Sequence, residues 1–94
     1  MTTLVSTNPA KNYEPVGEVT VTTEQEVATK VAAANAAKAD WRNTPLQTRI
    51  DLASLAYQIF QDRKEEIAQL ITKEVGKTIT NARNEMDYYL GHVE

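Results

Sequence analysis

The feature that most constrains the fold is a change of periodicity at Thr23. Upstream of Thr23, valines alternate with polar residues, and two of the three prolines of the chain lie there. This alternation is typical of short strands, and the Asn- and Pro-rich segment between them predicts a turn. Downstream, apolar residues recur at helical spacing. The sequence therefore predicts a mainly α fold, with a β-hairpin over residues 1–22 and a helical segment over residues 23–94.

Capping motifs divide the helical segment into about four helices. Thr23 and Glu26 have the spacing of a capping box, which satisfies two free backbone donors at a helix start. Thr44 is predicted to be the N-cap of the second helix, with Pro45 at its first position and Gln47 completing another capping box. The first helix is therefore expected to end just before Thr44.

Three further boundaries follow from the residues downstream. Asp62 with Glu65 is predicted to cap a third helix. Gly76 stands where a left-handed C-terminal cap is needed, and a fourth helix is predicted to begin near Thr78. The apolar spacing of that helix continues to Val93, so we expect the helix to continue beyond the last residues of the chain.

The apolar surface exceeds what so small a body can bury. The helix predicted over residues 45–61 has one polar stripe and is otherwise apolar, which is typical of a helix covered on more than one side. Trp41, at the end of the first apolar stripe, is predicted to fill the core. A domain of 94 residues buries only about 60–70% of its unfolded surface. The pattern indicates either a piece of a larger protein or a module that buries its excess against a partner.

Composition excludes several classes of function. Thirteen acidic against ten basic residues give a net charge of −3, which opposes nucleic-acid binding. The absence of cysteine excludes disulfides, zinc ribbons and a thiolate nucleophile within the chain. The single histidine, His92, cannot form a metal cluster alone, and no apolar run approaches the length of a membrane span. We expect a cytoplasmic chain with no nucleic-acid or membrane partner.

Two local features are candidates for binding. Gly76, Lys77 and Thr78 have the order that ends a phosphate-binding loop, but Ile71 occupies the position of its first glycine, so a helix cap is the better interpretation. Glu74 is predicted to lie in the last turn of its helix, where negative charge is unfavourable. This placement predicts either a compensating cation or a solvated carboxylate.

The order of the motifs resembles one family. Asn8-Pro9-Ala10 and Val16-Gly17-Glu18-Val19, followed by an Ala-rich helix that ends at Trp41, are similar to the opening of NAD(P)-dependent aldehyde dehydrogenases. The acidic, Leu-rich stretch 65–77 resembles the helix that ends in Glu-x-Gly-Lys in that family. The resemblance begins at about residue 6. Its one departure is the hairpin turn at residues 11–15, which is one residue longer than usual.

The resemblance implies that the parent protein oxidises an aldehyde to a carboxylic acid with NAD or NADP, through a thiohemiacetal on a cysteine located downstream. The chain would be a partial domain, the leading part of the coenzyme-binding domain of an α/β fold. Its partners would be the remainder of that chain and, in a homo-oligomer, further copies. No catalytic and no cofactor-binding residue carries over to this chain.

The family resemblance also implies a monovalent cation site. Its ligands would be backbone carbonyls at Ser6 and Thr7 together with the carboxylate of Glu74, because hard cations favour oxygen ligands. The alternative to the whole interpretation is a self-contained helical module that buries its surplus apolar surface by self-association.

Overall fold

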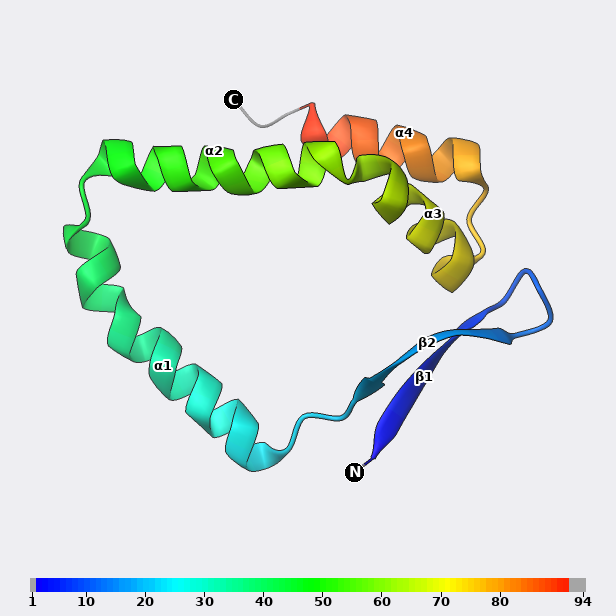
Figure 1. Cartoon of the computed structure of the whole chain (residues 1–94), viewed down its shortest axis with the longest axis horizontal. Coiled ribbons are helices and arrows are strands. Elements are labelled where there is room, and N and C mark those ends of the chain that lie inside the picture. The colour runs from blue at the N-terminus through cyan, green and yellow to red at the C-terminus, as the bar shows by residue number, and fades with distance from the viewer. Residues whose placement is uncertain (1, 92–94) are drawn as a thin grey trace.

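The computed structural model describes residues 2–91, which form a two-stranded hairpin followed by four helices (Figure 1). The elements are β1 (Thr3–Asn8), β2 (Glu14–Thr20), α1 (Glu24–Asn43), α2 (Leu46–Asp62), α3 (Lys64–Val75) and α4 (Ile79–Leu90). The mainly α architecture after an N-terminal hairpin is as predicted. Helix α4 ends at the cap residue Gly91. His92 and Val93 lie outside the described residues.

The hairpin has a tight, strained turn. β1 pairs with β2 in antiparallel register, with an irregularity between Ser6 and Thr7. The carbonyl of Asn8 accepts hydrogen bonds from the backbone N–H groups of Lys11 at 3.2 Å and Tyr13 at 2.8 Å. Asn12 and Tyr13 have φ angles of 54° and 59°. Asparagine tolerates this left-handed region, whereas tyrosine does so at a cost of about 1–2 kcal/mol.

Three of the predicted caps form. The backbone N–H of Thr23 donates to Glu26 Oε2 at 2.7 Å, and the N–H of Glu26 donates to Thr23 Oγ1 at 3.2 Å, which completes the capping box of α1. Gly76 ends α3 in the left-handed conformation, with φ 78°. The hydroxyl of Thr78 accepts from the N–H of Asn81 at 3.3 Å and caps α4.

Two predicted caps are wrong. The hydroxyl of Thr44 donates to the carbonyl of Asp40 at 2.7 Å, so Thr44 closes α1, and α2 begins after Pro45 without a side-chain cap. Asp62 is the last residue of α2, and the junction with α3 is the single residue Arg63. As the last residue of α2, Asp62 is helical and does not have the extended conformation of an N-cap, and its Oδ1 accepts from Gln58 Nε2 at 2.9 Å.

The packed part of the molecule is the α3–α4 pair. Its buried apolar residues are Ala68 and Ala82, whose small side chains let the two helices approach closely. The hydroxyl of Tyr57 donates to the carbonyl of Leu90, which ties α2 to the end of α4. β1 rests on α3. The hairpin therefore has the support that an isolated two-stranded sheet needs.

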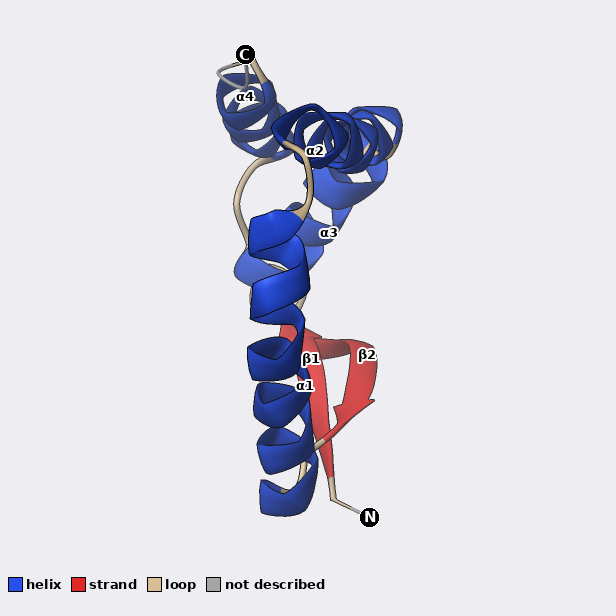
Figure 2. Cartoon of the chain, turned by 90° about the vertical axis from the view of Figure 1, so that its left-hand side faces the viewer, coloured by secondary structure: helices blue, strands red, loops and turns tan. Residues whose placement is uncertain are grey.

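The rest of the structure is an open frame (Figures 1 and 2). α1 buries no residue, and Figures 1 and 2 show it extending away from the α3–α4 pair. The molecule measures 50 × 38 × 15 Å. Its shortest dimension is little more than one helix diameter of about 10–12 Å. Its radius of gyration is 17.7 Å, against about 12 Å for a compact domain of this length.

This openness overturns one prediction. Trp41 is 48% exposed and fills no core, because no other element packs on the apolar stripe of α1. The total accessible surface is 7719 Å². A compact protein of 10.5 kDa exposes about 5,400 Å². The chain thus leaves about 2,300 Å² more surface in contact with solvent than its mass requires. Within residues 2–91, no helix is both long and apolar enough to cross a bilayer.

Candidate functional site

The junction between the hairpin and α3 is the best-defined site of the chain. Asn8 is 5% exposed and is the buried polar residue of the described part of the chain. Its Oδ1 accepts from the N–H of Ala10 at 3.0 Å, which fixes the start of the turn. A Cβ placed on Gly76 would lie 3.0 Å from Pro9 Cγ. The Asn8-Pro9 turn therefore rests directly on the glycine that ends α3.

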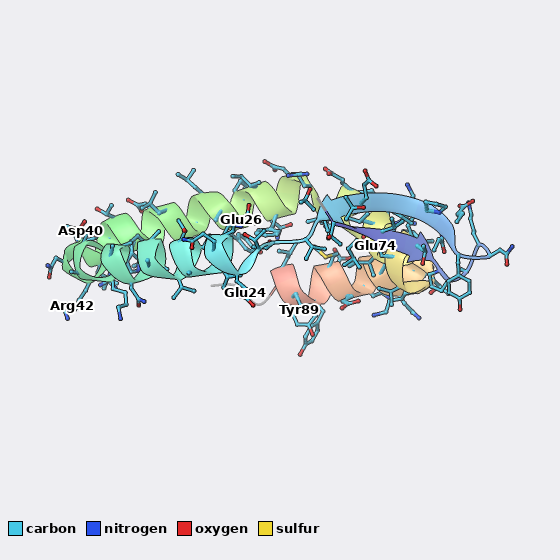
Figure 3. All side chains as sticks on the ribbon, turned by 90° about the horizontal axis from the view of Figure 1, so that it is seen from below. Glu24, Glu26, Asp40, Arg42, Glu74 and Tyr89 are labelled. Atoms are coloured by element: carbon cyan, nitrogen blue, oxygen red, sulfur yellow. The ribbon has the colours of Figure 1, made fainter. Side chains whose placement is uncertain are left out.

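Next to this junction, the hairpin and α3 line a hollow of about 460 Å³. Ser6 and Glu74, which the family resemblance places in one cation site, both line it. Thr7, the third predicted ligand, is half-buried and does not line the hollow. Figure 3 shows Glu74 beside the hairpin. The remaining lining residues come from the two strands: Leu4, Val5, Gly17, Glu18 and Val19.

The hollow favours a cation on electrostatic grounds. Glu74 lies in the last turn of α3, as predicted, and no basic side chain among residues 2–91 forms an ion pair with it. The strand pairing is irregular between Ser6 and Thr7, and the partner of Thr7 is Pro15. Proline has no N–H to donate to a neighbouring carbonyl. Ser6, beside the interruption of the sheet ladder, and the carboxylate residue Glu74 thus line the same hollow.

Sequence reasoning missed two residues near this site. Glu18 brings a second carboxylate to the hollow. Thr72 Oγ1 is buried and has no hydrogen-bond partner in the described part of the chain. No motif marks Thr72, and the Val16–Val19 motif does not indicate that Glu18 faces α3, because both placements depend on how the hairpin packs on that helix. No group of three or more His, Asp or Glu side chains among residues 2–91 could hold a metal ion. A cation here would therefore depend on backbone carbonyls.

Two further carboxylates of α3 form ion pairs with arginines. Glu65 and Glu66 occupy the first turn of α3. The Arg83 guanidinium lies 2.7 Å from Glu65 Oε1 and, with a hydrogen bond from Gln69, lowers the pKa of Glu65 to about 2. The hydrogen bond from Arg63 likewise lowers the pKa of Glu66. Carboxylates held ionised in this way are unsuited to act as general acids near neutral pH.

The stretch that imitates a phosphate loop is a helix boundary. Gly76 is a C-cap, Thr78 is an N-cap, and Lys77 Nζ lies 2.5 Å from Glu85 Oε2. The lysine is thereby held by a carboxylate of α4. The interpretation of this stretch as a glycine cap is confirmed.

Comparison with known proteins gives a consistent result. A family model described as "Aldehyde dehydrogenase family" matches residues 2–94. The chain is 34% identical over 87 residues to a malonate-semialdehyde dehydrogenase of Bacillus pumilus, an alignment that covers 93% of this chain. It is 36% identical over 91 residues to an alpha-ketoglutaric semialdehyde dehydrogenase of Bacillus subtilis, covering 89% of this chain.

A probable aldehyde dehydrogenase of Pseudomonas is 37% identical over 79 residues, which is 84% of this chain. These alignments span only 18%, 19% and 16% of the length of the three relatives, in the order given. The family model covers the hairpin, the cation-site candidates and all four helices. The chain belongs to the aldehyde dehydrogenase family, as an N-terminal segment of it.

Proposed function

We propose that this chain acts as the N-terminal segment of an NAD(P)-dependent aldehyde dehydrogenase, covers part of its coenzyme-binding domain and has no turnover by itself. The observation that carries the proposal is the uncovered apolar surface of α1 and α2. α2 alone exposes six large apolar side chains: Leu46, Ile50, Leu52, Leu55, Ile59 and Phe60. The remainder of an aldehyde dehydrogenase chain is the partner that would cover these faces.

The proposed parent reaction consumes an aldehyde, water and NAD(P)⁺, and yields a carboxylic acid, NAD(P)H and a proton. The coenzyme accepts the hydride, and the remainder of the protein supplies the cysteine nucleophile. Two of the relatives are named for malonate semialdehyde and alpha-ketoglutaric semialdehyde. We therefore propose a semialdehyde that carries a carboxylate as the substrate class.

The proposed site for a monovalent cation uses the Ser6 and Thr7 carbonyls and the Glu74 carboxylate. Ser6 and Glu74 fit this role because they line one hollow, and Glu74 lacks a protein cation among residues 2–91. A thermal melt of the chain, titrated with potassium against choline at constant ionic strength, tests it. Glu74→Gln should abolish the potassium-dependent rise in melting temperature. Melting that is unaffected by potassium in the unmodified chain would contradict the site.

Glu18→Gln is the matched control for that titration. Glu18 lines the same hollow and carries the same charge, but it is not among the proposed ligands. The potassium response should persist in this variant. An equal loss in both variants would show a general effect of negative charge and would exclude Glu74 as a specific ligand.

A chimeric enzyme tests the proposed function. This chain replaces the matching segment of 87 residues in the malonate-semialdehyde dehydrogenase of Bacillus pumilus. We expect aldehyde-dependent formation of NAD(P)H by the chimera and none by the relative with that segment deleted. A chimera that is folded by circular dichroism and binds the coenzyme, yet shows no turnover, would contradict the proposal.

A further inference from the structure

The hairpin turn and α3 line a second hollow, which has a volume of about 330 Å³. Its polar lining residues are Asn8, Lys11 and Glu14 of the hairpin and Gln69, Thr72 and Lys73 of α3. No residue lines both this polar hollow and the hollow that is lined by Ser6 and Glu74. The polar hollow is therefore separate from the candidate cation site.

Asn8 brings an unused hydrogen-bond donor to the polar hollow. The residue is 5% exposed, and its Oδ1 accepts from the N–H of Ala10 at 3.0 Å. Among residues 2–91, no group accepts a hydrogen bond from its Nδ2. Thr72 Oγ1 is likewise without a partner in the described part of the chain. Because an unmade hydrogen bond of a buried polar group is unfavourable, a ligand that accepts from Asn8 Nδ2 is favoured here.

The charges around the polar hollow favour an anion. Lys11 Nζ lies 3.9 Å from Glu14 Oε1, so the charges of these two side chains offset each other. Lys73 lies in the last turn of α3 and forms no ion pair among the described residues, so its positive charge is uncompensated. The negative end of the α3 dipole opposes an anion, but it is equivalent to only about half an elementary charge. The net potential in the hollow therefore stays positive.

We propose that the polar hollow binds a small oxyanion, a carboxylate or a phosphate, which accepts hydrogen bonds from Asn8 Nδ2 and Lys73 Nζ. Carboxylate and phosphate oxygens accept several hydrogen bonds at once, and those from a charged donor are the stronger ones. An apolar ligand would leave the Asn8 donor unpartnered, and a cation would meet the uncompensated charge of Lys73. The inference goes beyond the proposed function, because no residue of the polar hollow belongs to the proposed cation site.

Heteronuclear NMR of the 94-residue chain detects binding at Asn8 itself, because the side-chain NH₂ group has its own pair of resonances. Sodium phosphate and sodium acetate are titrated separately into the chain, with sodium chloride replaced at constant ionic strength and pH. We expect a shift of the Asn8 NH₂ resonances that saturates in the millimolar range with at least one of the two salts. The comparison of the two titrations shows which oxyanion is preferred. A shift that does not saturate with either salt, or no shift, would overturn the proposal.

Two lysine variants separate the site from a general effect of charge. Lys73→Gln removes the uncompensated cation of the polar hollow and should raise the Kd of the oxyanion by about tenfold or more. Lys30→Gln is the matched control, because Lys30 is exposed on α1, forms no ion pair among residues 2–91 and does not line the hollow. Its Kd should stay within about twofold of the unmodified chain, since distant exposed charges are screened by salt. Equal effects of the two variants would overturn the proposal.

Asn8→Asp tests the donor without removing the turn. The aspartate keeps an oxygen that accepts from the N–H of Ala10, but it replaces the Nδ2 donor by a negatively charged oxygen. Binding, followed at the backbone amide of Lys73, should be lost while the far-UV circular dichroism spectrum is retained. An oxyanion that binds this folded variant as tightly as the unmodified chain would overturn the proposal. If the variant unfolds, the Lys73→Gln titration decides the question, because that substitution is at an exposed residue.

Discussion

Replacement of Gly76 by alanine tests how the hairpin is held against α3. The residue has φ 78°, and its added Cβ would lie 3.0 Å from Pro9 Cγ and 3.7 Å from Ala10 Cβ. The left-handed conformation costs an alanine about 1–2 kcal/mol, and overpacking adds about 1–3 kcal/mol. Restriction of the unfolded chain offsets about 0.4–1 kcal/mol of this loss. We expect the free energy of unfolding to fall by about 1–5 kcal/mol overall.

Urea unfolding followed by far-UV circular dichroism measures this change, and Gly17→Ala is the matched control. Gly17 lies in β2, does not have a positive φ, and an added Cβ there meets nothing within 4 Å. That variant should be neutral or slightly stabilising. Pro9→Ala removes the close contact, so in a double-mutant cycle it should recover at least about 0.5 kcal/mol of the Gly76→Ala loss. A Gly76→Ala variant as stable as Gly17→Ala, or a strictly additive cycle, would show that Gly76 does not hold the hairpin turn against α3.

Three further predictions concern the helices. Thr23→Ala removes the capping box of α1 and should cost about 0.5–2 kcal/mol of helix stability, seen as lost ellipticity; an unchanged spectrum would contradict the cap. The pKa of Glu65 is lowered to about 2 by Arg83, so its stabilisation is complete above its ordinary value near 4.5 and is lost as the pH falls toward 2. Glu65→Gln should therefore flatten the stability profile in that acid range, and an unaltered profile would count against the ion pair. Ala82→Leu overpacks the α3–α4 contact and should lower the urea midpoint by an amount equivalent to about 1–3 kcal/mol. An unchanged midpoint would show that the two helices leave room for a larger side chain.

The order and type of the elements could be predicted because their signals are local. The change of periodicity at Thr23 separates the hairpin from the helices. The capping box of Thr23 with Glu26 marks the start of α1. Gly76 marks the end of α3 because only a residue suited to the left-handed region fits there. Such signals involve residues within one helical turn of each other, so they do not depend on how the elements pack.

What could not be predicted depends on neighbours that a local motif does not specify. Trp41 has the stripe position of a core residue, but whether it is buried depends on a partner for α1, and the chain supplies none among its described residues. Threonine is a residue type that N-caps favour, yet the hydroxyl of Thr44 donates a hydrogen bond to the carbonyl of Asp40. That Glu74 and Ser6 line one hollow follows from the docking of α3 on β1, which no local motif specifies.

We propose that this chain is a structural segment of an aldehyde dehydrogenase and works only with the remainder of such an enzyme. The most direct measurement is aldehyde-dependent formation of NAD(P)H in three samples: the chain alone, the Bacillus pumilus relative lacking its matching segment, and the two together. We expect turnover only in the combined sample. Turnover by the chain alone, or the same rate for the shortened relative with and without the chain, would contradict it.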